Sequence, residues 1–126
     1  MLDRARRPCN AGSRYDPVAY FASGRPAKGD PRFSVQHGGA RWLFASEANK
    51  RRFEADPGRY MPAYGGYCAY GTARGYLVEI DPNAWAIVND RLYLNYDRSV
   101  QATWMKDAPG FIRRADAQWP RLSRAK

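Results

Sequence analysis

The chain has 126 residues, which is enough for one domain of ordinary size and too few for two. Hydrophobic residues make up 44% and charged residues 26%, a globular composition that excludes an intrinsically disordered protein. The formal net charge of +9 is concentrated at the ends. Residues 1–14 hold four arginines and one aspartate, residues 111–126 hold five basic residues and one aspartate, and the part between has a net charge of only +2. This distribution argues against a nucleic-acid-binding protein.

The two cysteines, Cys9 and Cys68, are too few for a disulfide framework or for a zinc site made of four cysteines. No apolar run is long enough to cross a bilayer, and the basic N-terminal residues lack the apolar stretch of a signal peptide. We therefore expect no membrane span. The sequence as printed predicts a cytoplasmic protein, or a periplasmic or secreted one if a signal peptide precedes it.

The organisation expected from the sequence is simple. Residues 1–14 are basic, lack apolar periodicity and predict a flexible leader, while order should begin at Tyr15. Residues 15–122 should form one domain, and residues 123–126 a basic tail. No internal repeat is apparent.

Helix caps and glycine turns predict the first half of the domain. The pair Asp16-Pro17 places an N-cap before a proline and predicts a short helix to residue 21. Alternating residues around a Gly-Gly pair predict a β-hairpin over 33–44. Ser46 should cap a helix over 47–55, and a second Asp-Pro pair should start a short helix over 57–61.

Turn residues and helix caps also predict the second half of the domain. A helix is expected over 67–74, and an aromatic-rich hairpin over 85–95 with its turn at Asn89-Asp90. Asp97 or Ser99 should cap the next helix, and Pro109 should open a last helix with one apolar face. The fold class is therefore α+β: a small single domain with two β-hairpins packed by four or five short helices.

The side chains suited to chemistry are few. His37 is the single histidine, and its place beside a Gly-Gly turn is typical of an exposed side chain, with metal binding as the alternative. Residues 60–71 hold four tyrosines together with Met61 and Cys68, and sulfur ligands of these two kinds favour a soft metal such as Cu(I). If a helix begins at Tyr67, its dipole should lower the pKa of the Cys68 thiol. The alternative is that Cys68 and the tyrosines form part of the core.

Several segments, taken in order and spacing, resemble the YHS domain. The resemblance covers residues 15–122 and includes the stand-alone bacterial members of the family. It rests on the segments Asp16-Pro17-Val18-Ala19-Tyr20-Phe21, Trp42-Leu43-Phe44-Ala45-Ser46-Glu47-Ala48-Asn49, Tyr64-Gly65-Gly66-Tyr67-Cys68-Ala69-Tyr70, Asp81-Pro82-Asn83-Ala84-Trp85 and Leu92-Tyr93-Leu94-Asn95-Tyr96.

The resemblance implies a link to soft-metal handling, because other members of this family and of the similar TRASH domains are thought to bind metal through cysteines. The positions of those cysteines are occupied here by Ala19, Ala45 and Asn49, so that metal site is not carried over. Cys68, within the motif of the stand-alone members, is the remaining candidate ligand for copper or zinc.

The sequence thus favours a non-enzymatic binding protein. We expect soft-metal handling through Cys68, as a thiolate ligand or a redox-active thiol, with Asp16 as a hydrogen-bond acceptor behind the site. For Asp16, a simple helix cap is the alternative. Tyr20, Tyr67 and Tyr70 should form the walls of the ligand site or donate hydrogen bonds in it. The alternative function is a degenerate YHS scaffold that binds a small molecule or a protein partner without metal.

Overall fold

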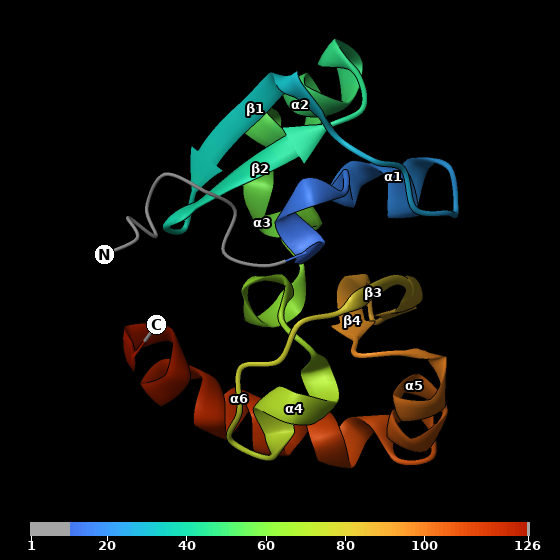
Figure 1. Cartoon of the computed structure of the whole chain (residues 1–126), viewed down its shortest axis with the longest axis vertical. Helices are drawn as coiled ribbons and strands as arrows, with labels where there is room; N and C mark the ends of the chain where they lie inside the picture. Colours follow the sequence, from blue (N-terminus) through green and yellow to red (C-terminus); the bar gives the residue numbers. More distant parts are fainter. Residues whose placement is uncertain (1–10, 126) are drawn as a thin grey trace.

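The computed structural model describes residues 11–125 and shows two lobes, one above the other along the longest axis (Figure 1). The first lobe comprises residues 11–62 and the second lobe residues 63–125. Each lobe contains one antiparallel two-stranded hairpin together with short helices, so the expected α+β class with two hairpins is confirmed.

In the first lobe, local signals determine where the elements begin and end. The Asp16 carboxylate accepts hydrogen bonds from the first turn of α1, and the Ser46 hydroxyl caps α2. Gly38 and Gly39 form the hairpin turn with φ of 62° and 82°, values that favour glycine. The elements are η2 (Ala11–Arg14), α1 (Pro17–Ala22), β1 (Asp30–His37), β2 (Ala40–Phe44), α2 (Glu47–Ala55) and α3 (Pro57–Tyr60).

In the second lobe the caps have the same positions but different residues. Cys68 is the N-cap of α4, and the Asp97 carboxylate caps α5. Asn89 and Asp90 form the hairpin turn, both with positive φ. The elements are η3 (Ala63–Gly66), α4 (Ala69–Ala73), β3 (Asp81–Val88), β4 (Arg91–Asn95), α5 (Arg98–Met105) and α6 (Ala108–Ala125).

The two lobes repeat one backbone plan, which the sequence did not lead us to expect. Asp30 pairs with Phe44 in the first hairpin and Asp81 with Asn95 in the second, the same register displaced by 51 residues (from 30 to 81 and from 44 to 95). Both hairpins also have their register irregularity at the same place, directly after this pair. The bounds of β1, β2 and the start of α2 reappear, with the same displacement, in β3, β4 and α5.

The repeat is difficult to see in the sequence because it preserves backbone positions rather than core side chains. Phe44 of the first lobe corresponds to Asn95 of the second, and Phe53 corresponds to Trp104. An aromatic ring and an amide do not resemble one another in a sequence comparison. Both side chains can occupy the same position of the same backbone arrangement, because caps and turns determine where the elements begin and end.

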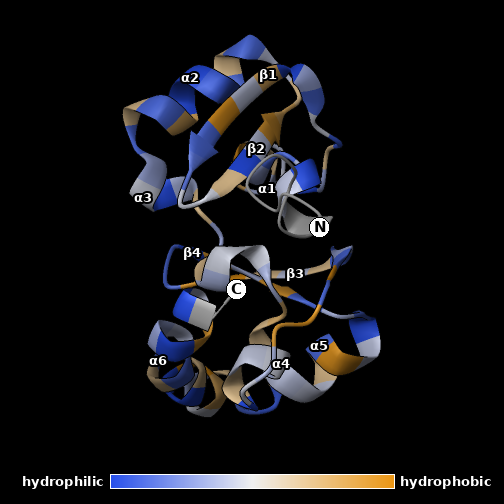
Figure 2. Cartoon of the chain, turned by 60° about the vertical axis from the view of Figure 1, so that its left-hand side comes forward, coloured by the Kyte–Doolittle hydropathy of each residue, from blue (hydrophilic) through white to orange (hydrophobic). Residues whose placement is uncertain are grey.

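Three apolar clusters hold the fold together. The first-lobe cluster is centred on Trp42, Phe44 and Phe53, and the second-lobe cluster on Tyr64 and Trp104. Hydrophobic residues gather on both hairpins, whereas most of α2 is hydrophilic (Figure 2). The third, central cluster joins the lobes, because its member Tyr20 comes from α1 and the others come from the second lobe. These others are Cys68, Ile80, Leu92 and Leu94.

Some expected boundaries change. Residues 11–14, expected to belong to the leader, form η2, and Ser13 is fully buried there. Residues 1–10 of the expected leader, including Cys9, lie outside the described residues. The last helix is longer than expected, because α6 continues past Pro120 and includes residues 123–125 of the expected tail. None of the helices in residues 11–125 has the length and apolar composition that crossing a bilayer requires.

Candidate functional site

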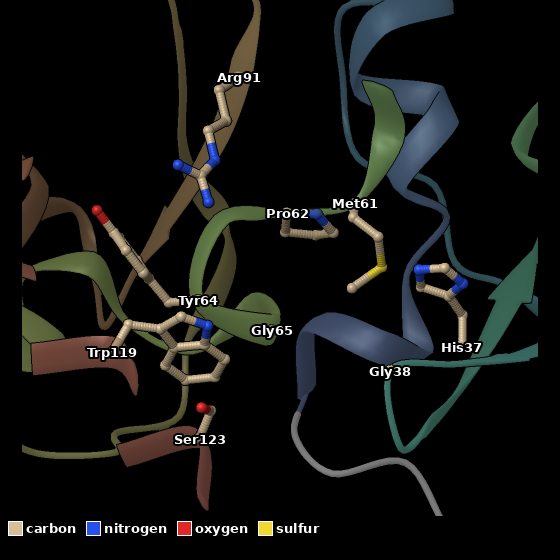
Figure 3. A pocket seen from close by; sticks show the side chains of 9 residues that line it. All are labelled: His37, Gly38, Met61, Pro62, Tyr64, Gly65, Arg91, Trp119 and Ser123. Atoms are coloured by element: carbon tan, nitrogen blue, oxygen red, sulfur yellow. The ribbon is translucent and has the colours of Figure 1, made fainter. Parts of the chain in front are cut away.

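A cleft of about 380 Å³ lies between the two lobes (Figure 3). Its first-lobe end is formed by the tip of the first hairpin and by the segment after α3, and its second-lobe end by η3, the start of β4 and α6. The residues that line the first-lobe end are His37, Gly38, Met61 and Pro62; those that line the second-lobe end are Tyr64, Gly65, Arg91, Trp119 and Ser123.

The second-lobe end combines one cation with two aromatic rings. The rings of Tyr64 and Trp119 lie edge to face with centroids 6.1 Å apart, and the Arg91 guanidinium lies 5.6 Å from the centroid of the Tyr64 ring. Arg91 is also 3.9 Å from a carboxylate oxygen of Asp116, a separation at the outer limit of an ion pair. Both side chains of this pair are about half exposed, at 48% and 52%, so the pair contributes at most about 1 kcal/mol. Arg91 therefore remains able to bind an anion in the cleft.

The Tyr64 backbone is strained at this point of the cleft. Its φ of 60° and ψ of 37° are left-handed, a conformation that costs a bulky residue about 1–2 kcal/mol. The Tyr64 hydroxyl donates a 2.9 Å hydrogen bond to the Asp116 carboxylate. Burial, followed by this hydrogen bond, raises the pKa of Tyr64 well above its ordinary value. The phenol thus stays protonated, and its ring is held in a fixed position against the cleft.

Cys68, the expected metal ligand, is buried in the central cluster and does not line this cleft. Its Sγ accepts hydrogen bonds from the backbone N–H groups of Tyr96 at 3.2 Å and Gly71 at 3.4 Å, and its thiol donates to Asn95 Oδ1 at 3.5 Å. Asn95 is itself fully buried, and Asn95 Nδ2 has no hydrogen-bond acceptor among the described residues.

The expected lowering of the Cys68 pKa is wrong. Burial has the largest effect and raises the pKa of this thiol, although the N–H groups of Gly71 and Tyr96 act in the opposite direction. The helix position was predicted nearly correctly, because Cys68 is the N-cap of α4. Helix termini lower a thiol pKa when water reaches the sulfur, and Cys68 is only 1% exposed.

Asp16 is a helix cap. Its carboxylate accepts hydrogen bonds from the N–H groups of Val18 at 2.8 Å, Ala19 at 3.3 Å and Ala45 at 2.8 Å, and from the side-chain amide of Asn49 at 2.8 Å. All four donors belong to the first lobe, and Cys68 belongs to the second. Asp16 is therefore the first-lobe counterpart of Cys68: each caps the first helix of its lobe and accepts the N–H of the residue after the hairpin.

The expected site tyrosines gather around Cys68, but each makes different contacts. Tyr20 is buried beside the Trp85 ring, and its hydroxyl donates to the Pro82 carbonyl at 2.9 Å. Burial raises the pKa of Tyr20 well above its ordinary value. Tyr70 is half-buried and its ring packs against Phe111, whereas Tyr67 is buried directly before Cys68. The structure thus brings Tyr20 and Cys68 into one buried cluster, with Tyr70 packed against it, and none of the three lines the cleft between the lobes.

The expected metal ligands do not come together in the described residues. Within residues 11–125, no group of three or more His, Cys, Asp or Glu side chains is placed to hold a metal ion. His37 lies at the first-lobe end of the cleft, with its ring edge-on to Phe53 at 5.5 Å. Met61, expected to act together with Cys68, lies beside Gly38 in the cleft instead.

The cleft itself was not predicted. One signal did point to it, because the tyrosine-rich segment 60–71 supplies Met61, Pro62, Tyr64 and Gly65 to its lining. The contributions of Arg91 and Trp119 depend on how the second lobe folds against this segment, which local patterns do not show. Comparison of the chain with family models, with curated proteins and with solved structures finds no match.

Proposed function

We propose that this protein is a non-enzymatic binding domain whose ligand, a small aromatic anion, occupies the cleft between the lobes. The observation that carries the proposal is the lining of the second-lobe end. Among the described residues that line the cleft, Arg91 is the one permanently charged side chain, and it stands beside the rings of Tyr64 and Trp119. A guanidinium pairs with a carboxylate or phosphate, and the partly exposed Trp119 indole can cover a flat ligand, while the Tyr64 ring, 1% exposed, supports the indole from behind.

Size and strain support the same site. A volume of about 380 Å³ is at the lower end of the range for small-molecule pockets, which favours a ligand of one or two rings. Strained backbone is found most often at ligand and active sites, and Tyr64 is the non-glycine residue of the cleft lining with positive φ.

The experiment is a titration of the full chain with benzoate, followed through the indole N–H resonance of Trp119 by NMR. We expect a saturable shift with a dissociation constant of about 1 mM, as suits so small a ligand. Benzamide, the neutral analogue, should bind several-fold more weakly, and Arg91→Gln should remove this difference. Arg113→Gln removes the same charge from an exposed position of α6 and should change nothing. Equal binding of benzoate and benzamide by the unmodified chain would contradict the proposal.

The YHS resemblance is part of the proposal, and one geometric fact supports it. The three positions at which metal-binding members of that family have cysteines, Ala19, Ala45 and Asn49, all donate hydrogen bonds to the carboxylate of Asp16. Positions that share a metal ion must converge in space, and these three do converge. In this chain two of the three thiol side chains are replaced by alanine methyl groups and the third by the Asn49 amide, which binds the Asp16 carboxylate, as expected of a scaffold that has lost that metal site.

Soft-metal handling through Cys68 is the second candidate function, with copper or zinc as the metal. The observation in its favour is the buried Asn95 amide, whose oxygen contacts the thiol and whose nitrogen has no acceptor among the described residues. A metal ion would have to enter the central cluster, so binding should be slow and accompanied by opening of the lobes. Measurement of Cu(I) uptake by the full chain and by Cys68→Ser tests it: uptake unchanged by the substitution would exclude Cys68 as the ligand.

A further inference from the structure

The first-lobe end of the cleft brings together an imidazole and a thioether. His37 is the last residue of β1, and Met61 is the C-cap residue of α3. Both line the cleft, and the Met61 sulfur points toward the His37 ring (Figure 3). The methyl carbon of Met61 is also 3.9 Å from the place that a Cβ on Gly38 would occupy, so the thioether lies directly against the tip of the first hairpin.

Packing holds both side chains in place. The His37 ring stands edge-on to Phe53 with centroids 5.5 Å apart, and Met61 packs against the first-lobe cluster to which Phe53 belongs. His37 and Met61 are each only partly exposed. The two donor groups therefore pack against the same apolar cluster and face the same cleft. This packing restricts their motion, in contrast to side chains that are fully exposed on the surface.

The chemistry of these donors selects the ligand. A neutral thioether binds soft cations and has little affinity for hard ones, and imidazole suits copper. Ca²⁺ and Mg²⁺ require oxygen ligands, mostly carboxylates, and the described lining of this cleft contains no Asp or Glu. A soft cation of low coordination number accepts one nitrogen and one sulfur donor.

We propose that His37 and Met61 bind Cu(I), or Ag(I), which has the same ligand preference, at the first-lobe end of the cleft. This inference rests on the proposed function, because it uses the same cleft as the binding site. It adds a metal ion as a second ligand, bound at the end of the cleft opposite Arg91. A thioether and a metal-binding imidazole are neutral ligands, so the bound ion keeps its positive charge. An aromatic anion bound in the same cleft would balance that charge, so each ligand should favour binding of the other.

The test is a titration with Ag(I), which does not change oxidation state, monitored by NMR of the methionine methyl groups. The full chain carries Cys9→Ser so that this thiol does not compete for the metal. We expect one equivalent to shift the methyl resonance of Met61 and the ring resonances of His37. Met105, which is 51% exposed, is the internal control and should not shift.

Variants separate the ligands from their surroundings. Met61→Leu keeps the volume and His37→Phe keeps the ring against Phe53, so both should fold. Each should weaken Ag(I) binding at least tenfold, and each should weaken Cu(I) binding as strongly in an anaerobic competition with a chelator. Met105→Leu should leave both affinities unchanged. Binding that survives Met61→Leu and His37→Phe, or binding that Cys68→Ser abolishes, would overturn the inference.

Failure of this inference can be told from failure of the proposed function. If benzoate shifts Trp119 while Ag(I) leaves Met61 unmoved, the metal site is refuted and the anion site stands. If Ag(I) shifts Met61 while benzoate leaves Trp119 unmoved, the anion-binding function fails and the metal site stands on its own observation.

Discussion

Replacing Asp16 by alanine is the substitution whose effect the structure determines most closely. The carboxylate accepts four hydrogen bonds, from the backbone N–H groups of Val18, Ala19 and Ala45 and from the Asn49 amide. Loss of an N-cap costs about 1 kcal/mol, and each further buried donor left without an acceptor costs about 1–3 kcal/mol. Asp16→Ala should therefore lower the free energy of unfolding by about 3–7 kcal/mol.

The assay is equilibrium unfolding in urea, followed by tryptophan fluorescence. Cys68→Ala is the matched control, because Cys68 occupies the corresponding position of the second lobe but accepts only two weak N–H···S bonds, at 3.2 and 3.4 Å. It should lower the free energy of unfolding by about 1–2 kcal/mol. Asp16→Asn should be intermediate, since it keeps the cap but turns an N–H₂ group toward donors.

Two results would refute this reasoning. The first is an unfolding free energy of Asp16→Ala within about 0.5 kcal/mol of the unmodified chain, the range of a surface substitution. The second is an increase in stability, which is what removal of a buried functional carboxylate without adequate partners would give.

Three further predictions concern the Cys68 thiol, the resemblance to the YHS domain and the close approach of Gly29 to Leu43. Because burial raises the pKa of the Cys68 thiol above its ordinary 9.0, the folded state binds this proton more tightly. The free energy of unfolding should be constant below that pH and fall above it in urea titrations, and Cys68→Ser should remove part of the fall. Cysteines in place of Ala19, Ala45 and Asn49 should create a tetrahedral metal site together with the Asp16 carboxylate. Binding of Cd²⁺ to this triple variant should give Cd²⁺–thiolate absorption in the ultraviolet, and its absence from a folded variant would count against the YHS resemblance. Gly29→Ala should destabilise the fold by more than about 2 kcal/mol in urea unfolding, because its Cβ would overlap the Cβ and the backbone of Leu43. Gly58→Ala, with open space around the new Cβ, should be neutral or stabilising.

The local structure was predictable because its signals lie within a few residues of one another. The helix over 47–55 and both hairpin turns were predicted correctly, and Asp97 proved to be the cap of α5. Each of these depends on a cap hydrogen bond or a turn conformation that the nearby residues determine. The same signals predicted Asp16 as a cap, and its hydrogen bonds confirm this role.

The site was much less predictable, because it depends on contacts between distant parts of the chain. Cys68 is buried because α1 supplies Tyr20 to the central cluster, a contact that no local pattern reveals. Arg91 and Trp119 reach the cleft only after β4 and α6 pack around η3. The repeat of the two lobes was missed for a related reason: it is a property of backbone register, and the paired positions hold unlike side chains, such as Phe44 and Asn95.

The central claim is that the cleft between the lobes binds an aromatic anion through Arg91. Its most direct test is the Trp119 indole N–H shift on addition of benzoate and of benzamide to the full chain. The account predicts a saturable shift with benzoate and a several-fold weaker one with benzamide, a preference that Arg91→Gln abolishes and Arg113→Gln preserves. A benzoate preference that persists in Arg91→Gln, or a Trp119 resonance that neither compound shifts, would contradict it.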